Sequence, residues 1–380
     1  MNTYIHTYIH TSNDKPLQKT ASTSDIRNCV FDIAKGIGIL LVVLGHAHCP
    51  NREFICLFHM ALFFIISGYF FGKKNYENIE NVKSFLKRRI KSLYLPYVIC
   101  NSIFILLHNF FININLYTNN PLYSDKAGFS QYYDTIVLIK KLIYTSLLTS
   151  EELLPSAIWF LKVLFFISIF FCIGSYLINK ITKKYFEYFR AAICIICLLF
   201  GWFLSLKHFN FYQIGTMFSS AILFYIGVLY KKFENKINLN FITFIISFII
   251  LLFCYYHNHI NRFFIGINYY NNPLWLIAAS VSGFLFVLYI SVQLSKISVS
   301  KKVLSYLGSH TMIILCLHVT FFKIITYLQI HIYNQPDYLL ASFTANITNN
   351  FWWLAYTIIG TICPLLLREI YIKIKQYKLL

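Results

Sequence analysis

The feature that most constrains this chain is a series of apolar blocks, each about 18 to 24 residues long, which is the length needed to cross a bilayer as a helix. Phe, Tyr, Ile and Leu recur in these blocks, and short basic or Asn-rich stretches separate them. Of the 380 residues, 58% are apolar and 12% are charged, whereas soluble domains carry about 25% charged residues. We therefore expect an all-α integral membrane protein whose main solvent is lipid.

The pattern predicts a bundle of about ten transmembrane helices. They are expected at residues 29–48, 54–72, 92–113, 156–179, 190–206, 211–230, 239–257, 273–295, 305–328 and 349–368. The amphipathic segment 133–149 is interrupted by Lys140 and Lys141. We therefore place it at the membrane interface, within a long outer connection over residues 114–155.

The ends of the chain differ in composition from its middle. Residues 1–26 are polar and rich in Ser and Thr, so they are expected to form a disordered cytoplasmic segment. Residues 27–370 are expected to form one transmembrane domain, and residues 371–380 a short basic cytoplasmic tail.

The charges describe membrane topology. The formal net charge of +19 would point to nucleic acid in a soluble protein, but here Lys and Arg cluster at the ends of apolar runs. The basic stretch from Lys73 to Lys91 marks its connection as cytoplasmic, which places both termini in the cytoplasm. Nucleic acid is not an expected partner. The ten Cys residues are scattered singly, so neither a disulfide framework nor a metal site is expected.

Three ionisable residues lie in the first predicted span, where each costs at least about 2.5 to 3.5 kcal/mol near a helix centre. These are Asp32, Lys35 and His46. Helical rotation between them amounts to about 300°, 20° and 320°, which places all three on one face. Lys35 and His46 are about 16 Å apart along the axis, so they mark two depths of one cavity. The alternative is that Asp32 and Lys35 form an anchor pair at the interface.

The second span opens with another imidazole, His59, and only a short loop separates the two spans. A tight antiparallel hairpin would bring His46 and His59 near each other in the outer half of the membrane. Imidazole suits proton transfer near neutral pH, so the pair is a candidate site. For a lone His within a span, a structural hydrogen bond is the alternative.

The sequence FDIAKGIGILLVVLGH (31–46) followed by FHMALFFIISGYFF (58–71) resembles the start of the acyltransferase-3 family, particularly its fucose 4-O-acetylase-like branch. In that branch a basic residue and a His are separated by ten residues in the first span, here Lys35 and His46. The broader family commonly has Arg in place of this Lys. Further partial matches are IWFLKVLF (158–165), AILFYIGVLYKK (221–232), NPLWLIAASVSGF (272–284) and LSYLGSHTMIILCLH (304–318).

The resemblance implies a membrane O-acetyltransferase of the bacterial cytoplasmic membrane. Its donor would be acetyl-CoA or another acyl-CoA, used as a co-substrate with no metal. Its acceptor would be a hydroxyl of a lipid-linked or surface sugar, such as O-antigen, capsule or exopolysaccharide. His46 would act as general base or transient acyl carrier, while Lys35, positioned by Asp32, would help hold the acyl-CoA.

The same resemblance extends to three substrate-binding candidates. His59 would lie beside the first-span His, and Trp159 would line the site or simply belong to the aromatic belt. His318 would orient His46 or bind the acceptor, with a helix-packing hydrogen bond as the alternative.

A transporter of a glycan intermediate or small acid is the rival hypothesis, since intramembrane Lys, Asp and His would be expected there too. We detect no repeat relating the two halves of the sequence, and the polar residues concentrate in the first two spans. Both observations favour the enzyme.

Overall fold

The computed structural model describes residues 23–125, 128–259, 263–345, 347 and 351–377. These residues are mainly helical and form no β-strand, which confirms the expected all-α class. The segment 1–22 and residues 378–380 lie outside the described residues, so the predictions for both chain ends are untested there. The helices are α2 (Thr23–His46), α3 (Arg52–Cys56), α4 (His59–Tyr69), α5 (Ile79–Arg89), α6 (Leu95–Leu106), α7 (His108–Asn113), α8 (Thr135–Ser146), α9 (Trp159–Ile181), α10 (Phe186–Leu206), α11 (Ile214–Phe233), α12 (Phe241–His259), α13 (Pro273–Leu294), α14 (Ser298–Ser309), α15 (Thr311–Ile332) and α16 (Trp352–Tyr377).

Seven helical segments in the described part of the chain are long and apolar enough to cross a membrane. Each overlaps one of the predicted spans, so the chain is a multi-pass membrane protein. The segments are Arg27–His46, Arg52–Tyr69, Ser156–Ile181, Phe186–Leu206, Phe211–Lys236, Pro273–Leu294 and Thr311–Ile332.

The other three predicted spans are helical but take different forms. Residues 92–113 are divided, because α6 ends at Leu106 and α7 begins at His108. The apolar part of α12 is shorter than in the seven long segments and covers Phe241–His257. The helix α16 is apolar up to Leu367 and carries charged residues beyond it.

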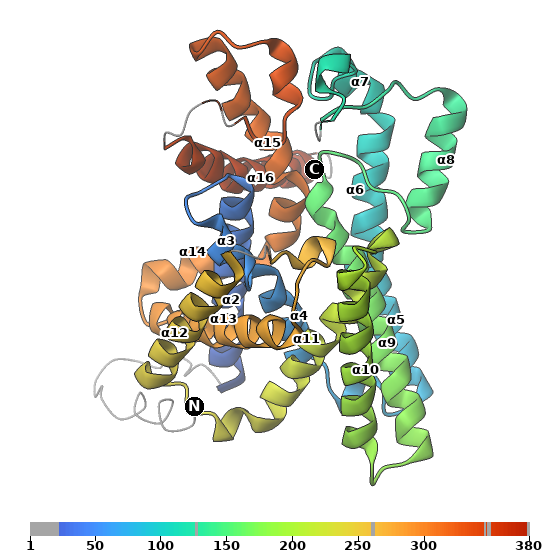
Figure 1. Ribbon diagram of the computed structural model, residues 1–380, viewed down its shortest axis with the longest axis vertical. Coiled ribbons are helices and arrows are strands. Elements are labelled where there is room, and N and C mark those ends of the chain that lie inside the picture. The colour runs from blue at the N-terminus through green and yellow to red at the C-terminus, as the bar shows by residue number, and fades with distance from the viewer. Residues whose placement is uncertain (1–22, 126–127, 260–262, 346, 348–350, 378–380) are drawn as a thin grey trace. The chain divides into compact units, whose positions relative to one another are not determined.

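The chain divides into two compact units, and each is described by itself. Unit 1 comprises Met1–Ile39, Glu53–Ser84 and Phe170–Ser309. Within it α11 packs against both α4 and α10, and α12 packs against α13 (Figure 1). The α4–α11 contact depends on glycine, because a Cβ added to Gly68 would lie 1.8 Å from the carbonyl oxygen of Phe224. Small residues of this kind let membrane helices approach at backbone distance.

Unit 2 comprises Leu40–Arg52, Phe85–Ile169 and His310–Leu380. Here α15 packs against α16, and α6 against α8 (Figure 1). A hydrophobic core joins α6, α7 and α15 to the connection between α7 and α9. It consists of Phe104, Phe111, Ile112, Tyr117, Leu154 and Val319.

Within that connection, the segment predicted to lie at the interface forms α8. The Asp134 side chain caps its start by accepting a hydrogen bond of 2.7 Å from the amide of Val137. At 12 residues the helix is about 18 Å long, so it is too short to cross about 30 Å of hydrocarbon. The side chains of Ile136, Ile139 and Ile143 are exposed on one side of it, as a helix lying against lipid would require.

Candidate active site

The central feature of unit 2 is a direct contact between two imidazole rings. His46, the last residue of α2, places Nδ1 2.7 Å from Nε2 of His318 on α15. The ring planes lie 22° apart and their centroids are separated by 5.0 Å. His318 is fully buried, whereas His46 is half-buried. The pair therefore joins a covered imidazole to one that a substrate can approach.

The surroundings of His318 determine where the protons lie. Its Nδ1 is 2.9 Å from the carbonyl oxygen of Ile314 and 3.1 Å from that of Leu315. A carbonyl oxygen can only accept, so this Nδ1 must carry a proton. Neutral His318 then has a lone pair on Nε2, which accepts the Nδ1 proton of His46. It follows that neutral His46 has its basic lone pair on Nε2, the arrangement that a general base requires.

Two neighbours shape the environment of His46. The ring of Phe343 packs edge-on against the imidazole, with centroids 5.1 Å apart. As the final residue of α2, His46 also lies at the negative end of the helix dipole, which favours a positive charge there. The dipole would stabilise an imidazolium formed at His46.

The other two ionisable residues of α2 form an ion pair in unit 1. Lys35 Nζ lies 2.7 Å from Asp32 Oδ1, and both side chains are about one-third exposed. Lys35 is eleven residues before His46 on the same continuous helix, so about 16 Å of helix axis separates them. Helix α2 can approach α14 closely because Gly308 has no side chain. A Cβ there would lie 1.8 Å from the carbonyl oxygen of Asp32.

The remaining predicted site residues have local partners. His59, buried in unit 1, places Nδ1 2.9 Å from the carbonyl oxygen of Ile55, one turn earlier. Trp159 begins α9 in unit 2, is half-buried, and lies with its ring 6.3 Å from that of Phe160. His46 thus contacts His318, the residue that the family resemblance implied would orient it.

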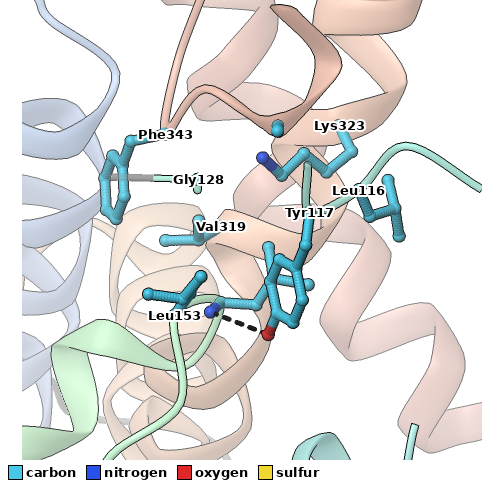
Figure 2. Close-up of a pocket in the computed structure, with 9 residues that line it drawn as sticks. Leu116, Tyr117, Gly128, Leu153, Val319, Lys323 and Phe343 are labelled. Atoms are coloured by element: carbon cyan, nitrogen blue, oxygen red, sulfur yellow. Dashed lines mark hydrogen bonds between the residues drawn. The ribbon is translucent and has the colours of Figure 1, made fainter. Parts of the chain in front are cut away.

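A small cavity in unit 2 adjoins the His46–His318 pair. Its volume, measured as the space open to the centre of a water molecule, is about 10 Å³. This is room for roughly one water. Phe343, which contacts His46, forms one wall, and Val319, the residue after His318, forms another (Figure 2). Its lining residues are Leu116, Tyr117, Gly128, Leu153, Leu154, Val319, Lys323, Ala341 and Phe343.

Comparison with known proteins identifies the family. A family profile described as an acyltransferase domain, that of the acyltransferase-3 family, matches residues 30–369. The chain belongs to the acyltransferase-3 family. Searches of curated proteins and of solved structures returned no match.

The match makes the chain a membrane acyltransferase. It covers nearly the entire described chain, including both residues of the imidazole pair. An acyltransferase needs a base to take a proton from its acceptor, and the hydrogen bonds of His46 are compatible with that role.

This acyltransferase holds the connection between α7 and α9 in place with a buried polar cluster. His108 and Glu152 are both about 1% exposed, with Nδ1 3.0 Å from Oε2. The ring of Tyr133 stacks on His108 at 3.5 Å, and its hydroxyl donates to Glu152 over 2.8 Å. Burial and the Glu152 carboxylate raise the pKa of Tyr133, so the phenol stays a donor. The cluster fixes the loop whose residues Tyr117, Gly128 and Leu153 line the cavity.

Sequence reasoning missed this cluster and the cavity. His108 and Glu152 are 44 residues apart, and no local pattern links them. Lys323 did carry a signal, because it is a charged residue inside an apolar span, which is a functional-site candidate by default.

Proposed function

We propose that this acyltransferase transfers an acetyl group from acetyl-CoA to a hydroxyl of a bacterial surface sugar, with His46 as the general base. O-antigen, capsule, exopolysaccharide or their lipid-linked precursors are the acceptors we expect, in line with the fucose 4-O-acetylase-like branch. The observation that supports the proposal best is the His46–His318 hydrogen bond of 2.7 Å.

In the proposed reaction, the acceptor hydroxyl gives its proton to His46 Nε2 while its oxygen bonds to the acyl carbon of the thioester. The carbon–sulfur bond then breaks, and the sulfur takes the proton from His46 to leave as the free thiol of CoA. His318 acts as a positioning residue, because its hydrogen bond holds the His46 tautomer. If His46 instead carries the acyl group transiently, Nε2 is again the reacting atom, since Nδ1 bonds to His318.

The rest of the proposal concerns binding and topology. We infer that Lys35, with Asp32 beside it at 2.7 Å, lies towards the cytoplasm and attracts the anionic CoA. His59 and Trp159 are proposed to contact the acceptor, since aromatic and imidazole groups suit sugar rings and hydroxyls. Ten spans with both termini in the cytoplasm, in the bacterial inner membrane, complete the arrangement.

The test is complementation of a deletion strain with wild type or with His46→Ala, followed by NMR or mass spectrometry of the surface glycan. We expect wild type to restore acetyl groups and His46→Ala to lose them, at equal protein level in the membrane. His331→Ala is a suitable control, because His331 is an exposed imidazole at the end of α15. Full acetylation by His46→Ala would remove His46 from the mechanism. A glycan that never carries acyl groups would favour the transporter.

A further inference from the structure

Lys323 places a cation inside unit 2 in an unusual setting. Its side chain is about 5% exposed and lines the cavity beside the imidazole pair. Nζ donates to two backbone carbonyl oxygens, that of Leu340 at 2.9 Å and that of Ser342 at 2.6 Å. An ammonium group has three N–H donors, so these bonds use two of them.

Lys323 lines the cavity, so its third donor is available on that side. Figure 2 shows Lys323 reaching from α15 with its nitrogen on the side of Gly128 and Phe343. Within the described part of the chain, Lys323 forms no ion pair with a carboxylate. A buried cation without a counter-ion is costly unless a ligand supplies negative charge. The group is therefore suited to an oxygen that becomes negative during the reaction.

Lys323 is linked to the proposed base through the segment that carries Ser342 and Phe343. Ser342, whose carbonyl binds Nζ, immediately precedes Phe343, whose ring contacts His46. On α15, Val319 lies one turn before Lys323 and directly follows His318. The walls of the cavity other than Lys323 are mainly apolar, which suits a methyl group.

We propose that this cavity binds the carbonyl end of a short acyl group and that Lys323 donates a hydrogen bond to the carbonyl oxygen. The inference rests on the proposed acyl transfer and adds the acyl subsite to it. When the acceptor oxygen bonds to the acyl carbon, the carbonyl oxygen becomes an oxyanion, and the ammonium stabilises it. When the carbon–sulfur bond breaks, the carbonyl re-forms. No proton leaves Lys323, so its role is electrostatic.

The small size of the cavity selects short chains. Space for about one water can take a methyl group after slight adjustment of the walls, but a longer chain would meet Val319 or the leucines. Acetyl transfer should therefore exceed butyryl transfer. One or two methylene groups in an apolar pocket change specificity by about tenfold or more.

The first experiment uses purified full-length protein in proteoliposomes, with acetyl-CoA or butyryl-CoA as donor and a soluble sugar acceptor. Val319→Ala should shift the ratio of kcat/KM towards butyryl-CoA by about tenfold. Val163→Ala is the matched control, since Val163 is equally buried in unit 2 but does not line the cavity. A gain with the longer donor cannot come from misfolding.

The second experiment replaces the cation. Lys323→Met keeps the length and apolar stem, and should lower kcat by about 10²-fold or more with little change in the KM for acetyl-CoA. The proposed acyl subsite would be wrong if Lys323→Met kept the wild-type kcat, or if Val319→Ala left the donor preference unchanged. Wild-type protein that transfers no acyl group from either thioester would instead overturn the proposed function itself.

Discussion

The position of one proton connects α15 with the chemistry of His46. Two backbone carbonyls hold the Nδ1 proton of His318, and the resulting lone pair on Nε2 orients His46. Backbone carbonyls are better suited to this task than a carboxylate within the membrane, because they hold the tautomer without burying a charge. The tautomer of His46 is therefore set before any substrate arrives.

His318→Leu should lower kcat by about 10²-fold or more, with a smaller effect on the KM of either substrate, because His46 loses the acceptor that fixes its tautomer. Steady-state kinetics in proteoliposomes measures the split between kcat and KM. His318→Gln, whose side-chain oxygen can accept the same proton, should recover part of the loss. Equal activity in His318→Leu and wild type would show that the bond is only structural.

The connection between α7 and α9 is folded, and its residues form much of the cavity wall. Glu152, near its end, pairs with His108 of α7. Gly128 packs against the backbone of Ala341, since a Cβ there would lie 1.9 Å from that residue's carbonyl oxygen. The exposed isoleucines of α8 give the element an apolar side as well. Its position is thus determined by contacts within unit 2.

Glu152→Gln should destabilise the protein by about 1 to 3 kcal/mol, since an amide cannot accept the hydrogen bonds of both His108 and Tyr133 and leaves a buried donor unsatisfied. Thermal unfolding in detergent would show this as a lower melting temperature. The control is Glu80→Gln, because Glu80 forms an exposed ion pair with Lys83, and such pairs contribute about 0 to 1 kcal/mol. Equal melting temperatures for the two variants would mean that the cluster does not hold the loop.

The molecule as a whole can be tested by its topology. With ten spans, alkaline phosphatase fused after Tyr377 should be inactive, and green fluorescent protein fused there should fluoresce. Fusions truncated after Ser130, in the connection predicted to lie outside, should behave oppositely. Phosphatase activity at Tyr377 would mean that an odd number of spans separates the cytoplasmic start of the chain from Tyr377.

The long helices could be predicted because hydropathy is a local property of the sequence. His46 was selected as a candidate for the same reason, as a polar residue within an apolar run. His318 was selected through the family resemblance. The division of residues 92–113 at Leu107 was not predicted, because the run is apolar throughout. The contact of His46 with His318 spans 272 residues, and only tertiary structure reveals which imidazoles meet.

The bonds of Lys323 also constrain how the protein is made. Its two acceptors, on Leu340 and Ser342, are synthesised 17 and 19 residues after it. While α15 enters the membrane, its ammonium therefore lacks the carbonyls that will later surround it, and charge in hydrocarbon is costly. The helix must wait at the translocon or in contact with water until Leu340 and Ser342 have been translated, so insertion of α15 depends on the segment that follows it.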